Sequence, residues 1–397
     1  ATSFVFGFGP LWESNFLSFI DDDGSGIEIN VRGGGIRKIP NAQLGQAYYR
    51  DKSVTTYDSV ADDYVVEYVS GAKNIYGVKS VYGFKDPLTS TDRYFLAESI
   101  DKQGRSTKFK YTEVSNYVHL TQIVDHYGET TNIAYGTGAN AHKIASITPP
   151  HSRSASFGYH TSGRLNSITD AESLQSTLVY NTSGFITSLT TPYGTTSFNL
   201  LRDESIASTA TPNPDLNRVN RCIIATYPNS SKEMWLYRNQ SEKLNGGTGS
   251  STYLVPKPEW DVPSTVPYSN KFDPDTHLRN SFHWRPKQYA LLGTFKTSLD
   301  FEDLQVKHYK WSHRKQWLHA GQSNDGVGST INMERLPSRD LSPSNDRTVR
   351  DWGQSTWYDY EGKSQQSHSW EGTQSLPLLV ASVVDYNETT GYEHTVY

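Results

Sequence analysis

Residues 155–168 read ASFGYHTSGRLNSI, and residues 176–189 repeat their pattern as STLVYNTSGFITSL. Two longer versions precede them, so one unit occurs four times between residues 101 and 189. Each unit contains a central tyrosine and ends on an aliphatic residue; the tyrosines are Tyr111, Tyr135, Tyr159 and Tyr180, and the aliphatic residues are Ile123, Ile147, Ile168 and Leu189. Successive tyrosines are 24, 24 and 21 residues apart. Such a period indicates one supersecondary unit stacked on copies of itself.

Each unit has the pattern of a β-hairpin. An apolar residue stands two positions before every tyrosine, at Phe109, Ile133, Phe157 and Leu178, and residues i and i+2 face the same side of a strand. A polar turn follows, and then a second strand with two aliphatic residues three positions apart, such as Ile144 and Ile147. Those two residues lie on opposite faces of a regular strand, or on one face if a β-bulge intervenes. We therefore expect a long antiparallel meander.

The stretches YHTSGRL (159–165) and YNTSGFI (180–186) resemble the Tyr-Asp-x-x-Gly-Arg-Leu signature of the RHS/YD-repeat family. The departures are His160 and Asn181 in place of Asp, and Phe185 in place of Arg. FGFGPLW (6–12) resembles the start of an RHS shell, and YDYEGK (358–363) and YNETTG (386–391) resemble degenerate units. The resemblance implies a spiral of strands that encloses a hollow. The core motif that precedes self-cleavage in cargo-releasing RHS shells is not reproduced.

We therefore expect a mainly β fold, in which the hairpin meander curls into a spiral shell or barrel with a small helical insertion around 275–320. Tyrosine-rich composition with 13% aromatic and 20% charged residues is typical of sheets rather than helix bundles. Five regions are expected: a strand-rich shell start (1–100), the hairpin repeats (101–198), a loop-rich segment (199–275), a helical plug (276–321) and C-terminal strands with degenerate units (322–397).

The helical plug is expected because apolar and aromatic residues follow a helical spacing. Leu304, His308, Trp311, Lys315 and Leu318 stand at i, i+4, i+7, i+11 and i+14, which places them on one helix face. A shorter helix is expected around residues 283–292, interrupted near Pro286.

The plug also contains the candidate catalytic residues. Five of the twelve histidines lie between residues 277 and 319, and histidine is the most frequent general base and metal ligand. The candidates are His308, Tyr309, His313, Arg314 and His319. Together they are a workable set for proton abstraction beside a carboxylate, and so for cleavage of an acidic polysaccharide by β-elimination. The simpler interpretation is that these side chains pack the plug against the sheet. No cofactor is expected.

One short segment resembles a metal loop. Asp21, Asp23 and Ser25 match the start of a calcium loop, but Arg32 occupies the twelfth position, where an EF-hand requires glutamate. We interpret the segment as a plain hairpin turn.

Charge and composition restrict the partners. A net charge of −5 disfavours nucleic acid, and no apolar run approaches the length of a membrane span. The single cysteine, Cys222, excludes an intrachain disulfide. An extracellular or cell-surface location is expected, with a signal peptide removed before Ala1, although excision from a longer protein would leave the same start.

These observations favour a structural scaffold or encapsulating wall over an enzyme. Unpaired strands at the two ends of the sheet would be edges able to pair with another copy of the chain. We expect strands near residues 386–397 to meet strands near residues 1–19, giving a homo-oligomer, tube or filament. The alternative function is a carbohydrate-binding protein or polysaccharide lyase that uses residues 275–320.

Overall fold

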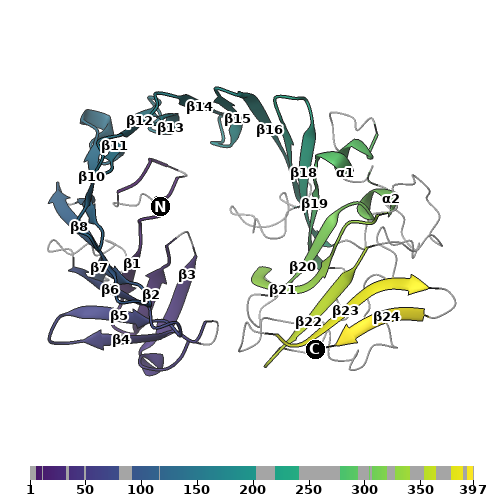
Figure 1. Ribbon diagram of the computed structural model, residues 1–397, viewed down its shortest axis with the longest axis horizontal. Helices are drawn as coiled ribbons and strands as arrows, with labels where there is room; N and C mark the ends of the chain where they lie inside the picture. The colour runs from purple at the N-terminus through teal and green to yellow at the C-terminus, as the bar shows by residue number, and fades with distance from the viewer. Residues whose placement is uncertain are drawn as a thin grey trace, which may run out of the picture. The chain divides into compact units, whose positions relative to one another are not determined.

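The computed structural model describes residues 6–10, 12–32, 35–48, 51–79, 92–115, 117–202, 220–240, 278–293, 304, 306–319, 327–339, 353–363, 377–387 and 391–396. Within these ranges the chain is almost entirely antiparallel β structure with two short α-helices, which confirms the expected fold class. The chain divides into two units, residues 1–194 and 195–397 (Figure 1). Each unit is described by itself.

The first unit begins with seven strands that precede the repeats. They are β1 (Phe19–Asp22), β2 (Gly26–Asn30), β3 (Ile36–Pro40), β4 (Val54–Asp58), β5 (Asp63–Glu67), β6 (Lys73–Lys79) and β7 (Asp92–Ile100). Strand β1 pairs with β2 on one side and with β7 on the other. The expectation that strands near residues 1–19 offer a free edge is therefore wrong for Phe19, because β1 lies between two neighbours.

The repeats form the meander that their pattern predicts. Their strands are β8 (Ser106–Val114), β9 (Tyr117–Val124), β10 (Thr130–Tyr135), β11 (Ile144–Thr148), β12 (Ala155–Tyr159), β13 (Leu165–Thr169), β14 (Gln175–Tyr180) and β15 (Ile186–Thr191). Each strand pairs antiparallel with the next in the sequence.

A β-bulge lies at the tyrosine in every hairpin, between Ala134 and Tyr135 in the second. Ile144 is therefore opposite Tyr135, whereas Ile147 is opposite Ile133. Since Ile133 and Tyr135 share a face, the two isoleucines share it as well. The bulge thus explains the three-residue spacing of the aliphatic positions and brings all of them to the apolar face.

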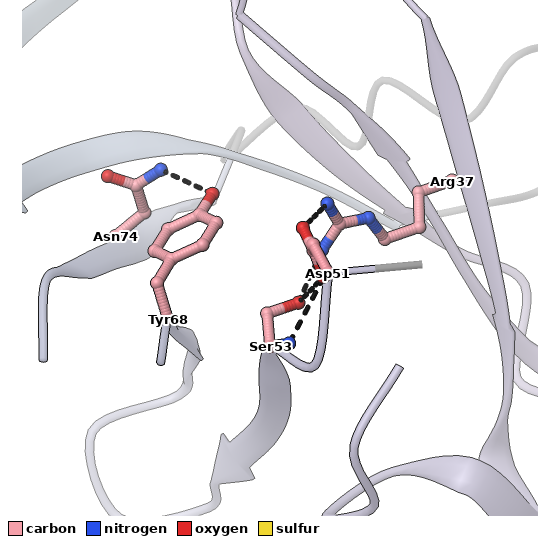
Figure 2. A network of polar contacts seen from close by, with 5 residues as sticks. All are labelled: Arg37, Asp51, Ser53, Tyr68 and Asn74. Carbon is pink, nitrogen blue, oxygen red and sulfur yellow. Dashed lines mark hydrogen bonds and ion pairs between the residues drawn. The ribbon is translucent and has the colours of Figure 1, made fainter. Parts of the chain in front are cut away.

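A polar network holds the connection between β3 and β4 (Figure 2). The Arg37 guanidinium donates to Ser53 Oγ at 2.7 Å and to Asp51 Oδ2 at 2.5 Å, and Ser53 Oγ donates to Asp51 Oδ1 at 2.7 Å. Burial alone would raise the pKa of Asp51, but the bonds from Ser53 and the Arg37 charge outweigh burial and lower it. The loop is therefore tied to β3 by a charged carboxylate.

The second unit is again a run of sequential antiparallel pairings. Its strands are β16 (Gly194–Arg202), β17 (Arg221–Thr226), β18 (Lys232–Gln240), β19 (Leu278–Trp284), β20 (His313–His319), β21 (Val327–Arg335), β22 (Ser355–Tyr360), β23 (Pro377–Asn387) and β24 (Gly391–Val396). Helices α1 (Pro286–Ala290) and α2 (Val306–Tyr309) lie between β19 and β20 in the sequence.

Among the described residues of the expected helical plug, less of the chain is helical than the sequence predicts. Of the described residues between 304 and 319, those of α2 are α-helical and residues 313–319 form strand β20. In β20 the buried residues alternate: Arg314, Gln316 and Leu318 are buried, and His313, Lys315 and Trp317 are half-buried. Two of the three buried residues are polar, so the alternation of buried and half-buried positions cannot be seen as an alternation of apolar and polar residues. The apolar residues that remain are spaced as in a helix.

No helix among the described residues is long and apolar enough to cross a membrane.

Candidate functional site

The repeat tyrosines link each hairpin to the one before it. In all four, the hydroxyl donates to a backbone carbonyl fifteen residues earlier: Tyr111 to Leu96 (2.8 Å), Tyr135 to Leu120 (2.9 Å), Tyr159 to Ile144 (2.5 Å) and Tyr180 to Leu165 (2.6 Å). The acceptor residues are all fully buried. We call these four bonds the tyrosine ladder. Three of the bonds cross from one repeat to its predecessor, and the Tyr111 bond crosses from the first repeat to β7. The repeats are therefore connected by more than strand pairing.

Burial raises the pKa of Tyr111, Tyr135 and Tyr159 well above the ordinary range. The hydroxyls therefore keep their protons and remain donors across the physiological pH range. Buried carbonyls that lose such a donor are costly, so the ladder contributes to stability as well as to register.

A fifth tyrosine repeats this arrangement in the second unit. The Tyr360 hydroxyl donates to the Ile331 carbonyl at 2.6 Å, and a β-bulge again lies at the tyrosine. The degenerate unit at 358–363 is therefore anchored by Tyr360, whereas the sequence match placed Tyr358 at the signature position. A bulge cannot be read from one sequence, and the Tyr-x-Tyr spacing left both tyrosines possible.

The segment at residues 6–12 lies across the ladder. The Trp12 indole Nε1 donates to the Tyr180 hydroxyl at 2.7 Å, and the Ile144 amide donates to the Gly7 carbonyl at 2.9 Å. The Phe8 ring contacts Phe157, with centroids 4.7 Å apart. The Phe6 ring contacts Tyr111 of the first repeat, with centroids 6.2 Å apart. This segment therefore contacts all four repeats and covers part of their apolar face.

Replacing Gly9 with alanine is expected to unseat this segment. A Cβ there would lie 2.4 Å from the Gly163 carbonyl oxygen, and the backbone φ is +85°. We expect a loss of at least about 2 kcal/mol of stability in urea denaturation, from strain and steric overlap together. Gly104→Ala is the matched control, because Gly104 has a φ of +80° and nothing near its Cβ position. Equal losses in the two variants would mean that residues 6–12 are not seated on the repeats.

The second unit has a groove on one face of its sheet, formed by strands β17 to β20. The strand register places side chains in two rows: Ile223, Trp235, His283 and His313 form one row, and Arg221, Tyr237, Ser281 and Lys315 form the other. The groove has a volume of about 320 Å³ and is lined by both rows. Both histidines come from the segment in which the sequence predicts chemistry.

Each groove histidine is oriented by a glutamate. His283 Nε2 lies 2.5 Å from Glu233 Oε1, and His313 Nε2 lies 2.6 Å from Glu334 Oε1. Burial alone would raise the pKa of Glu233, but hydrogen bonds from Tyr227 and His283 outweigh it and lower that pKa. Burial lowers the pKa of His313, and Glu334 opposes this effect. Each glutamate therefore holds the imidazole ring of one histidine in place.

The described side chains among the predicted catalytic residues are divided between the core of the second unit and the groove. His308, Tyr309 and Arg314 are buried, and the Tyr309 ring packs edge-on against Phe282 in the core of the second unit. Because adjacent residues of a strand face opposite sides, His313 lies at the groove while Arg314 points into the core. His319 belongs to β20; its side chain and all of His277 lie outside the described residues.

Two other sequence candidates have structural roles. Asp21 binds the Arg93 guanidinium through both carboxylate oxygens, and Asp23 accepts bonds from Ser25 and Gly26 within the β1–β2 turn. No group of three metal-binding side chains occurs in the described part of the chain.

Burial raises the pKa of the Cys222 thiol to about 12, so it remains protonated and is a poor nucleophile.

No family model and no curated protein matches the chain. Among solved structures it is similar to TcdB2-TccC3, with 8% identity and a TM-score of 0.25, covering 94% of this chain and 18% of that chain. A Tc holotoxin pore of Photorhabdus luminescens has 10% identity and a TM-score of 0.26, covering 92% and 19%. A porin-like protein from Bacteroides uniformis has 10% identity and a TM-score of 0.21, covering 88% and 96%. The chain spans about a fifth of the Tc toxin chains.

Proposed function

We propose that the chain is a structural scaffold, a wall segment of an RHS/YD-type β-shell that acts outside the cell or at its surface. The observation that carries the proposal is the tyrosine ladder, in which the same hydroxyl-to-carbonyl bond recurs at Tyr111, Tyr135, Tyr159 and Tyr180. Repeated, locally satisfied contacts let a sheet extend without a separate core for each unit. A sheet that extends in this way can form the wall of a shell. The resemblance of the repeats to YD units supports the same interpretation.

We further propose that copies of the chain join through strand edges. Among the described strands, β24 pairs with β23 alone, so its other edge has backbone groups that a further strand can pair with. Because β1 lies between two neighbours, the complementary edge belongs to another strand. Within the described part of the first unit, β3 has β2 as its single strand neighbour, which makes β3 a candidate for the acceptor.

Size-exclusion chromatography with light scattering, followed by negative-stain microscopy, tests this proposal. At micromolar concentration we expect assemblies larger than the 44.6 kDa monomer, including tubes or filaments. Thr395→Lys, on β24, is expected to reduce them, because a lysine on an edge strand opposes pairing with another strand. Ser156→Lys adds the same charge to β12, an interior strand, and is expected to assemble like the wild type. Monodisperse monomers at every concentration would contradict assembly through edges.

A further inference from the structure

The groove of the second unit combines exposed aromatic surface with two cationic side chains, Arg221 and Lys315. Trp235 is 38% exposed although it lies in the middle of a paired strand, and its ring stacks on His283 with an interplanar angle of 8°. The Arg221 guanidinium lies over the Tyr237 ring, 4.5 Å from the centroid. Partly exposed aromatic rings with a polar neighbour are typical of recognition surfaces.

The charged side chains that line the groove favour an anion as its ligand. Its charged and titratable lining residues are Arg221, Lys315, His283, His313 and Tyr237, and no carboxylate lines it among the described residues. The nearby acids, Glu233 and Glu334, hold the histidine Nε2 atoms, and Glu334 also lies 3.7 Å from Lys315. The two glutamates therefore orient the histidine rings, while the side chains of Arg221 and Lys315 in the lining can donate hydrogen bonds to a ligand.

The two rows have different chemistry. One row places Trp235 beside His283 and His313, and the other places Tyr237 and Ser281 beside Lys315. Adjacent strands are about 4.8 Å apart, so each row presents an aromatic ring and a cationic or titratable group about two strand spacings apart. The indole Nε1 of Trp317 donates to Ser281 Oγ at 3.0 Å, which fixes the centre of the second row.

We propose that this groove binds an acidic polysaccharide, with sugar rings stacked on Trp235 and Tyr237 and a uronate carboxylate bound by Lys315 and Arg221. A uronate chain provides both features that the rows require, a sugar face with apolar C–H groups and a carboxylate at regular intervals. Nucleic acid is the less suitable anion, because the chain carries a net charge of −5.

Titration calorimetry with oligogalacturonate tests the proposal, and methyl-esterified oligogalacturonate is the matched neutral probe. We expect the acidic oligomer to bind and the esterified oligomer to bind at least about tenfold more weakly, since removing one charged contact of this kind costs about 1.4 kcal/mol or more. Trp235→Ala is expected to weaken binding at least about tenfold. Lys315→Gln is expected to weaken it and to reduce its dependence on salt.

Tyr193→Ala is the control variant, because Tyr193 is an exposed aromatic residue of the first unit; it is expected to bind like the wild type. Equal binding of the two oligomers, unchanged binding by Trp235→Ala in a folded protein, absence of binding, or tighter binding of single-stranded DNA would each overturn the proposal. Circular dichroism of each variant establishes that it is folded. These results are independent of assembly through edges, so failure of one proposal does not imply failure of the other.

Discussion

Tyr135→Ala is expected to lower the free energy of unfolding by about 3 kcal/mol, the usual cost of deleting a large side chain from a core. The Tyr135 ring packs against the apolar core of the first unit and stacks on His119 with centroids 3.8 Å apart. Its hydroxyl satisfies the carbonyl of Leu120, which is fully buried. Alanine removes the packing and the hydrogen bond together, so the loss includes both.

Tyr135→Phe separates the two contributions. It keeps the ring and removes the hydroxyl, and the expected loss is about 1 kcal/mol because one buried carbonyl loses its donor. Tyr127 is the matched control: it lies in the turn that precedes the same hairpin and is 80% exposed. Both substitutions at Tyr127 are expected to change stability by less than about 0.5 kcal/mol in urea denaturation. A loss below that value for Tyr135→Ala would show that the tyrosine ladder is not part of the core.

Acidification is expected to destabilise the first unit through His119. This side chain is 3% exposed, its Nε2 lies 3.0 Å from His142 Nδ1, and His142 in turn stacks on Tyr117. Burial, with a smaller contribution from His142, lowers the pKa of His119 to about 4. Because the unfolded chain has the ordinary pKa near 6.5, it takes up the proton first as the pH falls. The stability that His119 contributes is therefore complete above about pH 6.5 and is lost as the pH falls toward 4, by at most about 3 kcal/mol.

Urea denaturation at about pH 7 and about pH 4.5 measures this loss. In His119→Gln the difference between the two pH values is expected to shrink, because the buried titrating group is gone. His151→Gln removes an exposed histidine of the same unit and is expected to retain the wild-type difference. If His119→Gln keeps the full pH dependence, the acid sensitivity arises elsewhere in the chain.

The hairpins were predictable because each one contains its own signals within about twenty residues. The tyrosine, the apolar residue two positions before it and the polar turn all recur in register, so the pattern indicates both the strands and their pairing. The bulge decides the face of residues such as Ile144, and the sequence leaves that choice open because it is set by pairing with the partner strand.

The second unit was less predictable because its pairings join distant segments. Strands β18 and β19 are separated by residues 241–277, so nothing local places Trp235 beside His283. The density of histidines drew attention to His313, which lines the groove. It could not distinguish His313 from Arg314, which lies on the opposite face of the strand. A helical interpretation of the same residues followed from the buried polar side chains of β20, whose burial depends on the folded unit.

Hydrogen–deuterium exchange of the wild type and Tyr135→Phe is the most direct test of the central claim, that tyrosine hydroxyls lock each repeat to its predecessor. We expect faster amide exchange in β9, β10 and β11, where the lost bond joined Tyr135 to Leu120, with a smaller effect in β8 and β12. Strands β17 to β20 are expected to exchange as in the wild type. Unchanged exchange in β9 to β11 would contradict the claim, as would an equal increase throughout both units.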